Sequence, residues 1–148
     1  MNLPKIHKVI LDIFLHFLLA LAISFIIFIK SGKLAYAIIF LGGGVLIDLD
    51  HLIDYYFFFR HKFTLKNFLS CAFLRSGKAY LFLHSWEIVF VGLILGATLE
   101  SIELLLFSLS LTLHLVIDNM QRKNLLCYFL IYRIAKKFEV RIILPEHN

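Results

Sequence analysis

The chain has 148 residues, of which 61% are hydrophobic and 16% aromatic, and its formal charge is +5. Soluble domains are about 45–50% apolar, so this composition and a mean hydropathy of +0.88 exclude an ordinary soluble domain. The length predicts one membrane domain over residues 1–148. The basic residues lie between the apolar segments, which argues against a nucleic-acid partner. Cys71 and Cys127 have no CxxC spacing and resemble ordinary apolar residues.

Four apolar segments are each long enough to cross a bilayer as a helix, which takes about 20 residues. They cover residues 9–29, 34–59, 79–99 and 102–120. The polar loop 60–78 and the tail 121–148 mix apolar and basic residues, a pattern typical of amphipathic segments at the membrane surface. The sequence therefore predicts an all-α fold, a polytopic bundle of four transmembrane helices with interfacial amphipathic segments.

Lysine and arginine are distributed unequally between the two ends of these predicted helices. Two lie before the first helix, five in the loop 60–78 and six in the tail, against two in the first turn and none in the second. Cytoplasmic loops of membrane proteins carry the excess of basic residues. We therefore expect an integral protein of the inner (plasma) membrane with both termini and the loop 60–78 in the cytoplasm.

Ionisable residues inside the apolar segments gather at one depth. At 1.5 Å per residue, each lies within a few turns of the predicted cytoplasmic end of its helix. Buried charges in a membrane usually face the bundle interior and mark a functional site. The layer contains His16, His51, His84 and His114 with Asp12, Asp48, Asp50, Asp54, Glu87 and Asp118.

Several members of this layer are spaced three or four residues apart, so that they project from one helix face. Such histidine and carboxylate pairs, contributed by facing helices, build metal sites inside bundles. Imidazole and carboxylate suit zinc, manganese or iron, and zinc or manganese is our first expectation, as one or two ions. The predicted metal ligands are His51, His84, His114 and Asp118 first, then Asp48, Asp50 and His16. The predicted catalytic residues are Asp48 and Glu87, with Glu87 as general base or as a partner of a ligand.

Four short motifs together resemble a known family. They are Leu46-Ile47-Asp48-Leu49-Asp50-His51, His16 in the first helix, Leu83-His84-Ser85, and the pair His114 and Asp118. In this order, over about residues 10–120, they are similar to small inner-membrane metal-dependent hydrolases, which are distantly similar to zinc-dependent phospholipase C. The resemblance implies a helical membrane bundle, a metal centre and hydrolysis of a phosphoester-like bond.

The substrate expected at this depth is a lipid or lipid-linked phosphate of the cytoplasmic leaflet, hydrolysed by a metal-activated water. Basic residues of the central loop are candidates to receive its phosphate, and anionic lipid headgroups are possible partners. These residues are Arg60, Lys62, Arg75 and Lys78.

Other interpretations remain open at this stage. The layer also fits a non-catalytic metal-binding or ion-transporting protein, or a set of polar contacts that only fixes helix packing. Asp54 is more consistent with solvation or a pair with Arg60 than with a metal. Asp12 fits either a support for His16 or a surface charge. Gly42 to Gly44 favour close helix packing.

Overall fold

In the computed structural model, residues 5–60, 62–122 and 124–144 are described. The chain is helical, and no strand occurs within those ranges; one isolated antiparallel bridge joins Lys78 to Glu139. The long helices are α1 (Ile6–Ser31), α2 (Leu34–Leu46), α3 (Asp50–Phe59), α5 (Trp86–Thr98) and α6 (Ile102–Met120). The short ones are the 3₁₀ turns η1 (Ile47–Leu49) and η2 (Ala72–Ser76) and the helices α4 (Leu65–Leu69), α7 (Leu130–Ala135) and α8 (Val140–Ile143).

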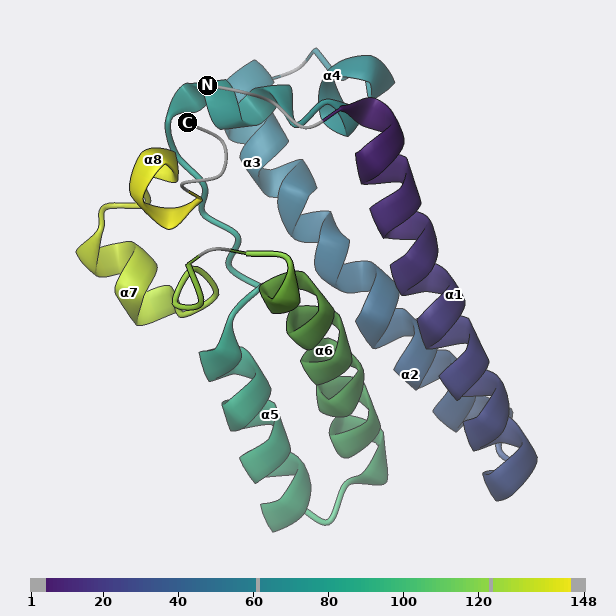
Figure 1. The fold of residues 1–148 in the computed structure, drawn as a ribbon. Coiled ribbons are helices and arrows are strands. Elements are labelled where there is room, and N and C mark those ends of the chain that lie inside the picture. Colours follow the sequence, from purple (N-terminus) through teal and green to yellow (C-terminus); the bar gives the residue numbers. More distant parts are fainter. Residues whose placement is uncertain (1–4, 61, 123, 145–148) are drawn as a thin grey trace.

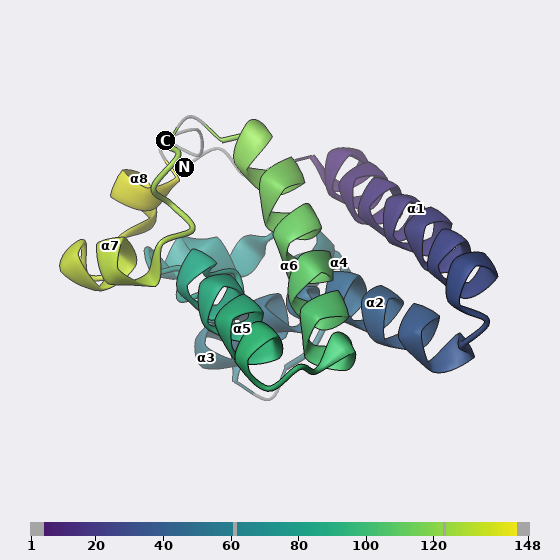
Figure 2. The ribbon, with the colours of Figure 1, turned by 90° about the horizontal axis from the view of Figure 1, so that it is seen from below.

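Two helical hairpins form the body of the molecule. α1 packs antiparallel against α2, which continues through η1 into α3, and α5 packs antiparallel against α6 (Figure 1). Seen from below, α6 lies between α5 and α2, so it joins the two hairpins (Figure 2). Both interhelical turns lie at the lower end of the view in Figure 1, and α4 and α8 lie at the other end.

Three helices are long and apolar enough to cross a membrane: Ile6–Ser31, Leu34–Phe59 and Ile102–Met120. Their outer faces are apolar and exposed; Phe25 and Ile29, for example, are each 62% exposed. This confirms an all-helical protein associated with a membrane. The helix α5 has only 13 residues, about 20 Å at 1.5 Å per residue, against a hydrocarbon core of about 30 Å. The described part of the chain therefore contains three such helices, and the expected fourth is not confirmed.

The segment expected to begin the third membrane helix is not helical over residues 79–85. Buried carboxylates of α3 bind its backbone instead. Tyr80 N donates to both carboxylate oxygens of Asp54, at 3.1 and 3.0 Å, and Leu83 N donates to Asp50. Non-helical backbone at membrane depth is tolerated where its polar groups are satisfied within the protein. These bonds hold the segment in a non-helical, bent conformation and delay the start of the helix until Trp86.

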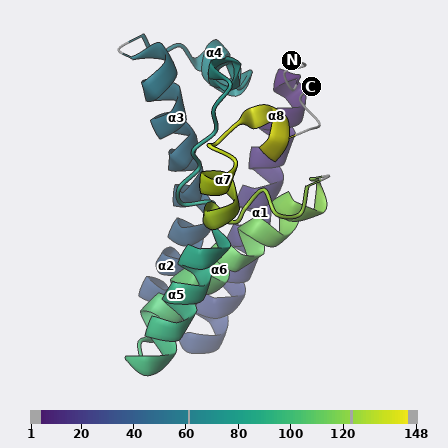
Figure 3. The same ribbon diagram turned by 90° about the vertical axis from the view of Figure 1, so that its left-hand side faces the viewer.

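The central loop and the tail pack against the bundle as short helices. Phe73 and Leu74 of η2 are buried, and so are Tyr128 and Val140 in the tail. In Figure 3, α7 and α8 lie in front of the upper half of the bundle. The sequence pattern of the tail resembles an interfacial helix, and Ile131 and Ile134 of α7 are indeed exposed, whereas Tyr128, Val140 and Ile143 pack onto the core. Arg133 is wholly buried in α7, which a surface amphipathic helix does not predict.

The glycines of α2 bring three helices together. A Cβ on Gly43 would lie 2.9 Å from the Phe107 carbonyl oxygen of α6, and one on Gly44 would lie 3.0 Å from Ala20 Cβ of α1. Small residues permit such close approach between membrane helices. The packing interpretation of these glycines agrees with the structure, and it places α1, α2 and α6 close enough for their polar side chains to meet.

Candidate metal centre

The predicted polar layer converges to one buried cluster. His16 comes from α1, Asp48 from η1, His84 from the bend before α5, and His114 and Asp118 from α6. The three histidines and Asp118 are each at most 7% exposed. Two overlapping groups have ligand atoms within 4.8 Å of one another: His16, His114 and Asp118, and Asp48, His84 and His114.

Two of these histidines are oriented by backbone carbonyls. His16 Nδ1 lies 2.9 Å from the Asp12 carbonyl oxygen, and His114 Nδ1 lies 2.9 Å from the Gly44 carbonyl oxygen. A carbonyl only accepts hydrogen bonds, so each Nδ1 carries the proton and donates. In each ring Nε2 therefore keeps a free lone pair, which is the form that binds a metal.

The third histidine is oriented by a carboxylate. His84 Nδ1 lies 3.3 Å from Asp50 Oδ2, and the same oxygen accepts from the His84 backbone N–H at 3.0 Å. Asp50 is wholly buried. Metal-binding histidines usually donate their second ring nitrogen to a carboxylate or a carbonyl in this way. Asp50 is predicted as a ligand, but in the structure it binds and orients the ligand residue His84 and does not itself belong to the cluster.

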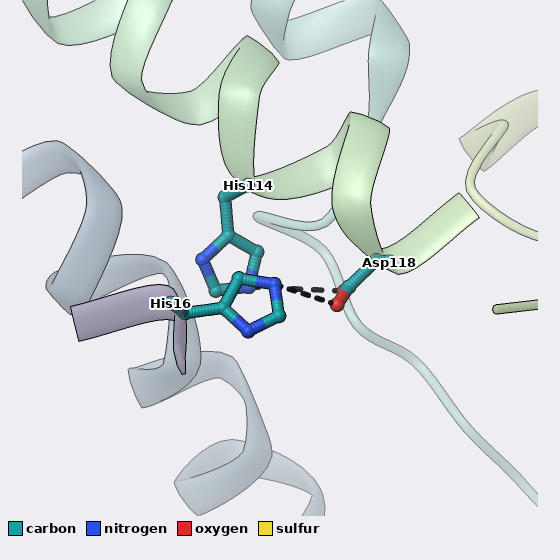
Figure 4. A group of neighbouring side chains, drawn as sticks. All are labelled: His16, His114 and Asp118. Atoms are coloured by element: carbon teal, nitrogen blue, oxygen red, sulfur yellow. Dashed lines mark ion pairs between the residues drawn. The ribbon is translucent and has the colours of Figure 1, made fainter. Parts of the chain in front are cut away.

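The three Nε2 atoms face two carboxylates. His16 Nε2 lies 3.2 Å from Asp118 Oδ1, and His114 Nε2 lies 3.6 Å from Asp48 Oδ1 and 3.7 Å from Asp118 Oδ2. His84 Nε2 lies 3.7 Å from Asp48 Oδ1 and 3.9 Å from Asp118 Oδ2. Figure 4 shows the rings of His16 and His114 side by side with Asp118 at one edge.

These separations fit a shared ion. With bonds of about 2.1 Å, two ligands of a tetrahedral ion lie about 3.4 Å apart, close to the 3.6 and 3.7 Å that separate His114 Nε2 from the two carboxylates. The Nε2 atoms of His16 and His84 are buried and have no hydrogen bond of acceptable geometry to any described residue. Buried polar atoms nearly always have a partner. The cluster can therefore hold a metal ion, and the geometry does not select which metal.

The remaining predicted ligand, His51, lies beside the cluster. Its Nε2 is 4.0 Å from Asp48 Oδ1, and its ring centroid is 5.0 Å from that of His84. Its Nδ1 is buried and makes no hydrogen bond within the described part of the chain. His51 belongs to neither of the two close groups.

Two aspartates of the layer have other roles in the structure. Asp54 is 4% exposed and binds the Tyr80 backbone, so it is neither solvated nor held by Arg60. The Asp12 carbonyl holds His16, and its carboxylate accepts from Gln121 Nε2 at 2.8 Å. Support of His16 by Asp12 thus agrees with the structure.

Glu87 is not brought to the cluster. Its Oε2 accepts from Leu130 N at 2.8 Å and its Oε1 accepts from Ile131 N at 3.0 Å. Both carboxylate oxygens are therefore engaged by the first N–H groups of α7, where a negative charge is favourable. In this arrangement Glu87 fixes the tail to the start of α5.

Sequence reasoning missed two residues that support the site. Arg133 Nη2 donates to Ser85 Oγ at 2.5 Å, and Ser85 Oγ donates to the Phe82 carbonyl at 2.6 Å. Together they hold the turn that carries His84. Burial lowers the pKa of the Arg133 guanidinium, while Asp50 and Glu87 act in the opposite direction. The only sequence signal was an arginine in an otherwise apolar stretch, and such residues are common at membrane surfaces.

Comparison of the chain with protein-family models, with curated proteins and with solved structures found no match. The geometry of the cluster therefore carries the functional argument by itself.

Proposed function

We propose that this protein is a membrane-embedded, metal-dependent hydrolase that cleaves a phosphoester of a lipid or lipid-linked substrate. The observation that carries the proposal is the common orientation of three histidines. Each has Nδ1 directed to an acceptor and Nε2 directed to the carboxylates of Asp48 and Asp118. A cluster that served only packing would pair each nitrogen with a hydrogen-bond acceptor at a normal distance, whereas the Nε2 atoms of His84 and His114 lie 3.6 to 3.9 Å from the carboxylates.

A divalent ion in this cluster, zinc or manganese first, as one or two ions, would supply Lewis acidity and lower the pKa of a bound water. His16, His84, His114 and Asp118 are buried deeply enough to hold it. The Asp48 side chain is 31% exposed, against 10% for Asp118. Asp48 is therefore the carboxylate most accessible to an entering substrate, and we assign it the role of general base.

The proposal includes an orientation in the inner membrane. α5 together with the non-helical segment 79–85 makes the fourth crossing, because carboxylates of α3 accept backbone N–H groups of that segment. The basic loop and tail then face the cytoplasm with both termini. The metal cluster opens toward the cytoplasmic leaflet, where a lipid phosphate lies.

Three basic residues of the central loop are exposed and available to attract that phosphate: Arg60, Lys62 and Arg75. Lys78 is less free, because its Nζ donates to the Lys137 carbonyl oxygen at 2.6 Å. Exposed basic groups near a membrane surface attract anionic headgroups by about 1 kcal/mol each.

The test is metal content and hydrolysis by the full chain purified in detergent. We expect the wild-type protein to bind at least one divalent ion and to release phosphate or a phosphorylated headgroup from lipid phosphates. His84→Ala and His114→Ala should lose both properties. Glu103→Gln, in the first turn of α6 far from the cluster, is the matched control and should retain both. Absence of metal from the folded wild-type protein after incubation with zinc and manganese would overturn the proposal, and metal uptake into sealed vesicles would favour transport instead.

A further inference from the structure

A groove of about 310 Å³ runs between α5 and α6. Its walls include Val91 and Gly92 from α5 and Leu104, Phe107 and Leu111 from α6. Figures 1 and 2 both show the two helices side by side. A Cβ on Gly92 would clash with Ser108 Oγ, so the absence of a side chain there keeps the two helices close. The groove is therefore a built feature of the α5 and α6 interface.

The groove leads to the metal cluster along one face of α6. Leu111, His114 and Asp118 are spaced by three and four residues, which places them on a common stripe. Leu111 is only about 4.5 Å along the helix axis from His114. On α5 the groove ends at Glu87, three residues after His84. Neither His84 nor His114 lines the groove. Its nearer end, at Leu111, lies about one helical turn from His114, and the other end extends about 10 Å toward Leu104.

The groove is apolar and faces the bilayer. Its one charged lining residue, Glu87, has both carboxylate oxygens engaged by backbone N–H groups of α7. Val91 is 55% exposed on the outer side of α5, so the groove is reached sideways from the surrounding hydrocarbon. The one hydroxyl of the lining, that of Ser108, is only 1% exposed. A hydrophilic ligand therefore finds little polar surface in the groove, whereas hydrocarbon chains already surround it.

We propose that this groove binds one acyl chain of a membrane phospholipid and so places the phosphate of that lipid at the metal cluster. The inference rests on the proposed hydrolase function, whose substrate class it specifies. A lipid tail gains little free energy by moving from bilayer to groove, because the two are equally apolar. The groove acts instead by orientation, holding the scissile bond within reach of the cluster.

The experiment uses the full chain in phosphatidylcholine vesicles that contain a small fraction of phosphatidic acid with a photoreactive diazirine in one acyl chain. After illumination, labelled peptides are located by mass spectrometry. The compared regions are the groove segments of α5 and α6 and the outer face of α1 around Phe25 and Ile29, which bulk lipid also contacts. Val91→Trp fills the groove from its exposed side. Ile94→Trp adds the same bulk at a residue that is 62% exposed and does not line the groove.

We expect several-fold more labelling of the groove than of α1, and unlabelled phosphatidic acid should reduce groove labelling selectively. Val91→Trp should lower the groove labelling to that of α1, and it should reduce hydrolysis of long-chain lipid phosphates by about tenfold or more, equivalent to about 1.4 kcal/mol. Ile94→Trp should change neither. Equal labelling of groove and α1 in the wild type, or a groove signal unaffected by Val91→Trp, would overturn the inference.

Metal content measured on the same samples separates this inference from the proposed function. Selective groove labelling in a protein that binds no metal would contradict the hydrolase and leave the acyl-chain site standing. Metal-dependent hydrolysis that is equally fast for soluble and long-chain phosphates, without selective labelling of the groove, would support the hydrolase and contradict the acyl-chain site.

Discussion

The histidines of the cluster share one bonding pattern, and this pattern determines which ring nitrogen each presents. In each ring Nδ1 faces an acceptor outside the cluster and Nε2 faces Asp48 or Asp118. The acceptor is a backbone carbonyl for His16 and His114 and a buried carboxylate for His84. The carboxylate makes His84 a more basic ligand than His16 and His114. A negatively charged acceptor at Nδ1 strengthens the ability of Nε2 to donate its lone pair to a metal.

Asp50→Asn should therefore weaken metal binding by about 10–100-fold, the usual effect of removing a support of a metal-binding histidine. Asp54→Asn is the matched control. Asp54 is also a buried carboxylate of α3, and it accepts the backbone N–H of Tyr80 in the non-helical segment 79–85. We expect Asp54→Asn to keep an affinity close to that of the wild type. Competition with a chromophoric chelator measures both, and equal affinities for the two variants would contradict the role assigned to Asp50.

At the scale of elements, carboxylates on helices position neighbouring segments. Asp50 and Asp54 hold the non-helical segment before α5, and Glu87 holds the N-terminus of α7. Hydrogen bonds to a charged acceptor contribute about 1.5–3 kcal/mol each, and losing a buried one leaves its partner unsatisfied. Side chains of α3 thus fix the non-helical segment 79–85 beside the cluster.

Glu87→Gln should distinguish two roles of Glu87: holding the N-terminus of α7, as the structure shows, and acting as the general base, as the sequence predicts. An amide retains one acceptor oxygen and loses the charge, so we expect the protein to be destabilised by about 1–2 kcal/mol, with metal content unchanged. Thermal unfolding and metal analysis measure the two effects. A loss of hydrolysis of about 100-fold or more in a folded, metal-loaded variant is the size expected for a general base, and would return that role to Glu87.

The glycines of α2 offer a matched pair for helix packing. Gly43→Ala should destabilise the protein by about 1–3 kcal/mol, the usual cost of overpacking, because its Cβ would lie 2.9 Å from the Phe107 carbonyl oxygen. A Cβ on Gly42 meets only Leu46 Cδ1, at 3.8 Å, so Gly42→Ala should be neutral or stabilising by up to about 1 kcal/mol. Unfolding by increasing SDS in mixed micelles measures both. Equal stabilities would show that α2 and α6 do not need this close contact.

At the scale of the whole molecule, the polar cluster lies inside a bundle whose outer surface is apolar. The two interhelical turns lie at one end and the basic loop and tail helices at the other. The two ends of the molecule therefore differ in charge. In the proposed orientation the basic end, with the loop and the tail, remains in the cytoplasm.

Cysteine accessibility in intact cells tests this orientation. In a background with Cys71 and Cys127 replaced by Ala, Ser31→Cys and Ser101→Cys in the two turns should react with a membrane-impermeant maleimide added outside. Ser76→Cys in η2 should react only after the cells are opened. Labelling of Ser76→Cys in intact cells would reverse the orientation.

Burial raises the pKa of the Cys71 thiol to about 11. Little thiolate is therefore present near pH 8, so maleimide labelling of Cys71 in opened cells that carry the wild-type protein should be slow and should increase with pH.

The sequence by itself determined the helical membrane class, the two hairpins and the candidate members of the polar layer. These depend on local properties, namely the length of apolar runs, the position of basic residues and the rise of 1.5 Å per residue. The predicted layer contains the five residues that meet, His16, Asp48, His84, His114 and Asp118, together with five that do not distinguish themselves from them in the sequence.

Tertiary structure decided which members of that layer meet and where the third apolar segment becomes helical. The apolar character of residues 79–85 predicts a helix, yet buried carboxylates 26 to 34 residues earlier in the chain bind its backbone N–H groups. The separation of Asp50 and Glu87 from the ligand cluster likewise depends on N–H groups supplied by distant segments. Local patterns in the sequence do not contain these long-range hydrogen bonds, which form only when the helices pack.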